Sequence, residues 1–158
     1  MNISIMVDYA HEPASMESLL QTLATYKKQG HFDKVIHIVS CDGVGRDDWK
    51  KPVMGDLSQK YVDFSIVTTE NYGKDDNPNE ILQLLSQNFV GSNFVLEIDR
   101  KEAMQIALDI AQSDPKNKYL LVSTGVGCEF GLTRPTGIIQ WDERQIWREL
   151  FESMAKSS

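Results

Sequence analysis

Short apolar runs alternate with helical patterns along the whole chain. Apolar, often β-branched runs indicate strands, whereas apolar residues three and four positions apart indicate helices. Strands are expected at residues 3–7, 35–39, 64–67, 94–98 and 119–122, with a short sixth strand at Ile138, Ile139 and Trp141. Helices are expected at residues 14–27, 52–61, 79–88, 100–110 and 143–151. This alternation predicts an α/β fold, a three-layer sandwich with a mostly parallel five- or six-stranded sheet and helices on both faces.

Polar residues mark the starts of several of these helices. Asp99 is followed three residues later by Glu102, which is the spacing of a capping box. Asp142 is expected to cap the last helix, and either Asp8 or Ser15 the first one. These signals are local, so they place helix boundaries without any assumption about function.

Composition and charge narrow the class of protein. The 158 residues are expected to form one domain, and 41% apolar residues allow it a core. A net charge of -7 argues against nucleic acid as the main partner, because phosphate binding needs clustered Lys and Arg. No apolar run approaches the ~20 residues of a membrane span, and the N-terminus lacks the basic region of a signal peptide. Cys41 and Cys128 are far apart, which favours free thiols in the cytosol.

The stretch V-D-Y-A-H-E-P joins the first strand to the first helix. Open α/β sheets bind ligands outside the carboxyl ends of their strands, so this polar segment is a candidate site. The alternative interpretation, which the sequence supports equally, is that this segment is a solvated loop whose polar residues only cap the helix. The loops after the second, third and fifth strands leave the sheet at the same edge. The candidate ligand residues on that edge are Asp8, His11, Arg46, Asn71 and Glu129.

Common catalytic motifs are missing from the sequence. It has no phosphate-binding G-x-x-x-x-G-K-[ST] and no G-x-S-x-G, and its histidines lack metal-ligand spacing, with His37 expected to be structural. Four cations could meet an anionic group or be solvated instead: Arg46, Lys50, Lys51 and Arg134. The residues alone therefore define a ligand edge but no reaction.

Several loop segments, taken in order, resemble the C-terminal domain of the Mur ligases. V-D-Y-A-H-E-P looks like the family's V-D-Y-A-H-T-P, and G-R-D-D-W-K-K-P-V-M-G like its D-R-D-x-x-K-R-P-x-M-G. T-E-N-Y lies where the family carries D-N-P-R, and G-V-G-C-E where it carries G-K-G-H-E. D-R-K-E-A-M-Q-I-A-L and D-E-R-Q-I-W-R-E-L match two further motifs. The resemblance covers nearly the whole chain and is nearest to the members that add the third amino acid of the peptidoglycan stem.

The resemblance implies a Rossmann-like sheet with one antiparallel strand, in the last of three domains of a bacterial cytoplasmic ligase. The central domain would hold ATP and magnesium, and the partners would be an amino acid and UDP-N-acetylmuramoyl-dipeptide. This chain alone would be inactive, without catalytic residues or metal ligands of its own. By position, the resemblance places Asp8 and His11 near the nucleotide, Arg46 at the amino-acid carboxylate, Asn71 in the D-N-P-R segment, and Gly125 and Glu129 at the far end of diaminopimelate.

This sequence departs from the family pattern at the amino-acid site. Gly73 stands where diaminopimelate enzymes have the arginine of D-N-P-R, and Glu70 and Tyr72 replace its aspartate and proline. Val126 and Cys128 replace the lysine and histidine of G-K-G-H-E. Lysine, ornithine or another third residue therefore fits as well as diaminopimelate.

The extent of the chain leaves two origins open. The central ATP-binding and N-terminal UDP-sugar domains are not in this sequence, so it is expected to be an excised domain rather than a stand-alone protein. The alternatives to a ligase domain are a non-catalytic binding module that kept the fold, and a C-terminal domain like that of folylpolyglutamate synthetases.

Overall fold

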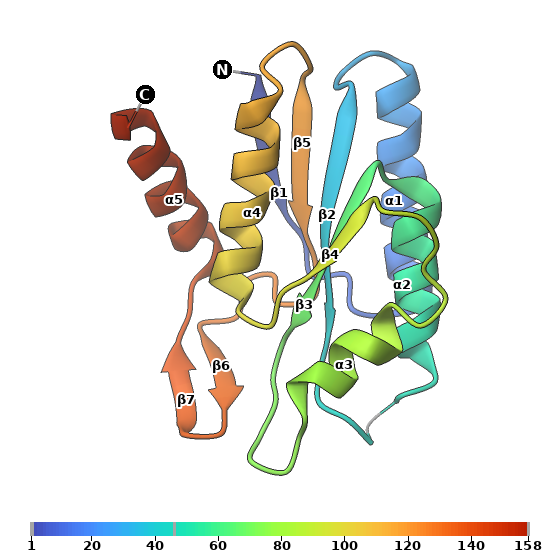
Figure 1. Ribbon diagram of the computed structural model, residues 1–158, viewed down its shortest axis with the longest axis vertical. Coiled ribbons are helices and arrows are strands. Elements are labelled where there is room, and N and C mark those ends of the chain that lie inside the picture. Colours follow the sequence, from blue (N-terminus) through green and yellow to red (C-terminus); the bar gives the residue numbers. More distant parts are fainter. Residues whose placement is uncertain (1, 46, 158) are drawn as a thin grey trace.

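The computed structural model describes residues 2–45 and 47–157. Its main sheet has five strands in the order β1-β5-β2-β3-β4, and every neighbouring pair is parallel. The strands are β1 (Ile3–Val7), β2 (Lys34–Cys41), β3 (Phe64–Thr69), β4 (Phe94–Leu96) and β5 (Tyr119–Ser123). The expected parallel α/β sheet is confirmed, with each of these strands within two residues of its predicted position (Figure 1).

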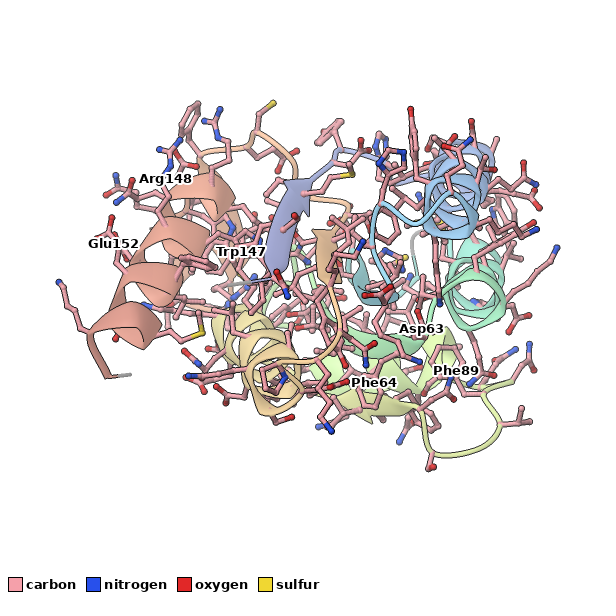
Figure 2. All side chains as sticks on the ribbon, turned by 90° about the horizontal axis from the view of Figure 1, so that it is seen from above. Asp63, Phe64, Phe89, Trp147, Arg148 and Glu152 are labelled. Carbon is pink, nitrogen blue, oxygen red and sulfur yellow. The ribbon has the colours of Figure 1, made fainter. Side chains whose placement is uncertain are left out.

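Helices cover both faces of the sheet. They are α1 (Pro13–Lys28), α2 (Lys50–Tyr61), α3 (Pro78–Leu85), α4 (Arg100–Ser113) and α5 (Glu143–Ser157). Alternate residues of β2 serve opposite faces, because successive strand side chains point to opposite sides. Val35 and Val39 pack with residues of α1, α2 and α3, whereas Ile36 and Ile38 pack with residues of α4 and α5. The result is the predicted three-layer sandwich, seen end-on in Figure 2.

The sixth predicted strand forms, but not in the main sheet. Strand β7 (Gly137–Gln140) pairs antiparallel with β6 (Gly131–Arg134) in a separate two-stranded hairpin, and Trp141 follows β7. The antiparallel strand that the resemblance implied for the main sheet is therefore wrong for the described residues, which place antiparallel pairing in this hairpin only. All four residues of β7 are exposed, so this strand contributes nothing to the core.

The helix caps are confirmed in two cases and corrected in one. The Asp99 carboxylate accepts hydrogen bonds from the backbone N–H groups of residues 101 and 102, and the Asp142 carboxylate from those of residues 144 and 145. Helix α1 has Glu12 as its N-cap residue, and the Ser15 hydroxyl donates to the Glu12 carbonyl at 2.9 Å. Asp8 does not cap α1, because its carboxylate accepts from the backbone N–H of Ala10 instead.

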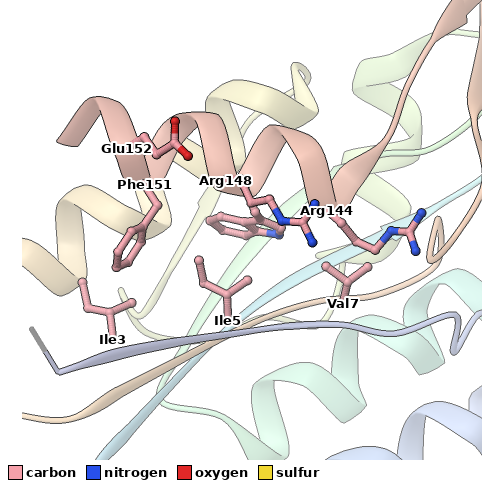
Figure 3. A pocket seen from close by; sticks show the side chains of 8 residues that line it. Ile3, Ile5, Val7, Arg144, Arg148, Phe151 and Glu152 are labelled. Carbon is pink, nitrogen blue, oxygen red and sulfur yellow. The ribbon is translucent and has the colours of Figure 1, made fainter. Parts of the chain in front are cut away.

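Helix α5 packs along the edge strand β1. A groove of about 530 Å³ lies between them, with Ile3, Ile5 and Val7 on one side and Arg148 and Phe151 on the other (Figure 3). Trp147 of α5 also lines this groove. This groove is separate from the carboxyl edge of the sheet, where the polar loops gather. Within the described part of the chain, no helix combines the length and the hydropathy needed to cross a membrane.

Candidate functional site

A small polar pocket lies at the carboxyl edge of the sheet, among the loops that follow β1, β2, β3 and β5. Its volume is about 50 Å³. The lining residues are Tyr9, His11, Cys41, Asp42, Lys50, Glu70, Asn71, Gly125 and Glu129. Parallel strands end at one edge, so residues far apart in the sequence meet here. The structure thus brings together four of the predicted site residues, which are His11, Asn71, Gly125 and Glu129, and the candidate cation Lys50.

Asp8 is a predicted site residue that does not line this pocket. The Asp8 carboxylate turns back on its own loop and accepts from Ala10 N–H at 2.8 Å. Arg46 lies outside the described residues, so its predicted contact with a substrate carboxylate stays a prediction. The described residues nearest to it in sequence belong to the loop between β2 and α2, at the same edge of the sheet.

Tyr9 and Glu129 close one wall of the pocket. The Tyr9 hydroxyl donates to Glu129 Oε1 at 2.8 Å, which joins the loop after β1 to the loop after β5. The same tyrosine lies over Gly127, where a Cβ atom would come within 2.6 Å of the ring. The hydrogen bond to Glu129 and the negative charge of that carboxylate raise the pKa of the Tyr9 phenol. The Tyr9 hydroxyl therefore holds the Glu129 carboxylate in place.

Glu70 is a second carboxylate of the pocket, and it is only 6% exposed. Its Oε1 accepts from the Ser40 hydroxyl at 2.7 Å. Burial raises the pKa of Glu70 to about 7, although the nearby charge of Arg100 opposes this rise. Gly125 leaves room for this side chain, because a Cβ atom at that position would overlap Glu70 Oε1.

A buried ion pair forms the support beneath Glu70. The Arg100 guanidinium donates to both oxygens of Glu143, at 2.8 and 2.7 Å, and both side chains are fully buried. Arg100 also donates to Ser40 Oγ and to the Thr124 carbonyl, while Trp141 Nε1 donates to Glu143. Such a pair, with its remaining donors and acceptors satisfied, fixes the strand ends that carry the pocket.

His37 extends this buried polar layer toward α2. Its ring nitrogens lie 2.8 Å from Ser58 Oγ and 2.9 Å from Thr124 Oγ1. Burial, together with the positive charge of Arg100, lowers the pKa of His37 to about 3. The imidazole is therefore neutral at physiological pH, and the predicted structural role of His37 is confirmed.

Asn71 holds loops together as well as lining the pocket. Its side-chain amide donates to Asp42 Oδ1 at 3.0 Å, and its side-chain oxygen accepts from Thr133 N–H at 2.9 Å. The backbone N–H of Tyr72 adds a bond to the Thr133 carbonyl. Asn71 thus ties the β6-β7 hairpin to the edge of the sheet. A larger depression of about 410 Å³ adjoins it and shares Asp42 and Asn71.

The other cations that the sequence singled out are engaged within the protein. Lys50 pairs with Glu12 at 2.7 Å, and Lys51 is buried and donates to the Gly43 carbonyl and to Asp48. The Arg134 guanidinium donates to the Glu70 carbonyl and lies 4.7 Å from the centroid of the Tyr72 ring. Lys50 is the one of these three that lines the pocket.

Sequence reasoning did not assign Asp42 and Glu70 to the site. Asp42 follows directly after β2, and Glu70 directly after β3, as Asp8 follows β1. The strands expected from the sequence end at Val39 and Val67, three residues before Asp42 and Glu70, so an acidic residue at the same distance after both strands is a signal that would have found them. Among the described residues, no three His, Cys, Asp or Glu side chains gather as ligands for a metal ion.

The sequence of the chain matches a known protein family and curated relatives. The model of a family described as "Mur ligase, glutamate ligase domain" matches residues 1–125. The UDP-N-acetylmuramoyl-L-alanyl-D-glutamate--2,6-diaminopimelate ligase of Chlamydia caviae is 34% identical over 150 residues, which cover 94% of this chain and 29% of that enzyme. The chain spans about 30% of the length of the curated relatives it matches.

Solved structures agree with this assignment. A structure of UDP-N-acetylmuramoyl-L-alanyl-D-glutamate--2,6-diaminopimelate ligase superposes with a TM-score of 0.82 at 22% identity, over 98% of this chain and 30% of that one. Mycobacterium tuberculosis folylpolyglutamate synthase, complexed with ADP and AMPPCP, gives 0.56 at 21% identity over 77% of this chain and 26% of that one. At such identities the structures show a shared fold, and the diaminopimelate ligase shares more of it. The family match and the 34% identical relative show that this chain belongs to the Mur ligases and corresponds to their C-terminal domain.

Proposed function

We propose that this chain is the amino-acid-recognising part of an ATP-dependent ligase that adds the third amino acid to UDP-N-acetylmuramoyl-dipeptide in the bacterial cytoplasm. The observation that carries the proposal is the pocket in which Glu70 and Glu129 both take part. A side-chain ammonium is a donor without acceptors, so it is best held by carboxylates and carbonyl oxygens. Tyr9 engages one oxygen of Glu129, which leaves the other for a ligand.

The remaining parts of the reaction belong to a longer ligase. ATP with magnesium would supply the phosphoryl group that activates the carboxylate of the dipeptide. In this proposal the central domain of the longer ligase holds ATP and magnesium. Asp8 and His11 would lie near the nucleotide, and Arg46 would pair with the carboxylate of the incoming amino acid through two parallel hydrogen bonds.

The side chain of the third amino acid is recognised through its ammonium in this proposal. Gly73 has no side chain that could supply a positive charge. The Arg134 guanidinium already donates a hydrogen bond to the Glu70 carbonyl and lies over the Tyr72 ring. A second carboxylate on the ligand, as in diaminopimelate, therefore has no ready partner among these residues. We expect lysine and diaminopimelate to compete within about tenfold of each other, and a hundredfold preference for diaminopimelate would show that Arg134 or another cation binds that group.

Steady-state kinetics of a longer ligase that contains this chain test the proposal. Glu129→Gln keeps the shape of the side chain and removes its charge, so the amino-acid KM should rise about 10- to 150-fold, the worth of a charge-assisted hydrogen bond. The KM for ATP should change little. Glu80→Gln is the matched control, because Glu80 is an exposed carboxylate on α3 away from the pocket. An unchanged amino-acid KM in Glu129→Gln would refute the ammonium site.

A further inference from the structure

Tyr9 links two loops that the proposed function uses separately. It stands two residues before His11, and the His11 Nδ1 lies 2.8 Å from the Tyr9 carbonyl. The two rings also contact each other, with centroids 4.8 Å apart. On its other side the Tyr9 hydroxyl donates to Glu129, which is 120 residues away in the sequence. The hydroxyl is thus the direct connection between the loop after β1 and the ammonium-binding carboxylate.

We propose that Tyr9 is a positioning residue for the ammonium site: its hydroxyl fixes Oε1 of Glu129, so that Oε2 is presented to the side-chain ammonium of the ligand. This inference rests on the proposed function of Glu129. Glu129 is half-buried, and among the described residues no other side chain donates a hydrogen bond to it. Without the phenol, the carboxylate would keep the rotational freedom of a long side chain, which binding would then have to remove.

The loop that carries Glu129 is shaped to accept Tyr9. Gly127 has a φ of +58°, and a Cβ atom there would lie 2.7 Å from the Tyr9 Cβ and 3.0 Å from its Cα. The tyrosine therefore lies directly on the backbone of this loop, in contact that only glycine permits. Packing and hydrogen bond act together: the ring fixes the loop, and the hydroxyl fixes the side chain at its end.

Tyr9→Phe separates these two contributions, because it keeps the ring on Gly127 and removes the hydroxyl. In the longer ligase, the amino-acid KM should rise about two- to tenfold, the worth of one hydrogen bond, while kcat and the KM for ATP stay unchanged. Tyr26→Phe is the matched control. Tyr26 is also 47% exposed and also contacts a histidine ring, that of His31, but lies on α1 away from the pocket.

Two further readouts distinguish positioning from a general structural role. In the 158-residue chain, ¹³C NMR of the Tyr9 ring should show a phenol pKa above the ordinary value that returns toward it in Glu129→Gln. In the ligase, Tyr9→Phe should raise the amino-acid KM little further when it is combined with Glu129→Gln, because the effects of mutating the two partners of one hydrogen bond are not additive.

The outcomes separate this inference from the proposed function. If Glu129→Gln raises the amino-acid KM and Tyr9→Phe does not, the positioning role is overturned while the ammonium site stands. The same conclusion follows if the Tyr9 pKa does not respond to Glu129→Gln. If Glu129→Gln itself leaves the KM unchanged, the proposed function fails first. A KM increase in Tyr9→Phe that is absent in Tyr26→Phe and is lost in the Glu129→Gln background supports the inference.

Discussion

Gly125→Ala tests the packing of Glu70 against the loop after β5. Gly125 has a φ of +96°, and an added Cβ would overlap Glu70 Oε1 and lie 2.6 Å from its Cδ. The left-handed backbone alone costs an alanine about 1–2 kcal/mol. Forcing the buried carboxylate to move adds about 1–3 kcal/mol of overpacking. The free energy of unfolding should therefore fall by about 2–5 kcal/mol.

Gly30→Ala is the matched control for the backbone contribution. Gly30 has a φ of +81°, but a Cβ there would meet nothing within 4 Å. Urea denaturation of both variants should show that Gly125→Ala is the more destabilising by about 1–3 kcal/mol. Equal losses of stability in the two variants would refute the close packing of Glu70 on Gly125.

Three other predictions concern the buried charged groups. Burial raises the pKa of Glu70 from 4.5 to about 7, so between these pH values the folded protein keeps a proton that the unfolded chain loses. The contribution of Glu70 to the free energy of unfolding should therefore fall as pH rises from 4.5 to about 7. This contribution to the pH dependence of stability should vanish in Glu70→Gln. Because the ionised form binds an ammonium, the amino-acid KM of the longer ligase should also fall as pH rises through about 7 in wild type and stay flat in Glu70→Gln. Arg100→Met leaves Glu143 buried without its cation, so urea denaturation should show a free energy of unfolding lower by about 3–5 kcal/mol. The control Lys101→Met, on the exposed side of α4, should change the free energy of unfolding little. Similar losses in the two variants would contradict the buried ion pair.

Features with local causes were predictable from the sequence. Asp99 and Asp142 cap their helices because a carboxylate one residue before a helix reaches its first N–H groups whatever the tertiary structure. The parallel sheet was predictable from the short apolar runs between helical patterns, because a strand that is covered on both faces is apolar at nearly every position. The grouping of His11, Asn71 and Glu129 followed from the same topology, because loops after parallel strands share one edge.

Features that depend on distant contacts were not predictable in the same way. The hairpin β6-β7 stays out of the main sheet and is held by Asn71, 62 residues away from Thr133. Glu70 is buried, which its place in a polar loop does not indicate, because Ser40 and the Arg100 ion pair surround its carboxylate. Both arrangements join segments whose pairing has no local sequence signal.

Recognition of a side-chain ammonium by the Glu70–Glu129 pocket is the central claim, and one NMR titration of the 158-residue chain tests it most directly. Lysine and norleucine have the same number of side-chain carbons, but norleucine lacks the terminal ammonium. Lysine should produce saturable backbone shifts at Tyr9, Gly125 and Glu129, and these shifts should be absent in Glu129→Gln. Norleucine should produce none at the same concentrations. Equal shifts with both amino acids, or lysine shifts that persist in Glu129→Gln, would contradict the account.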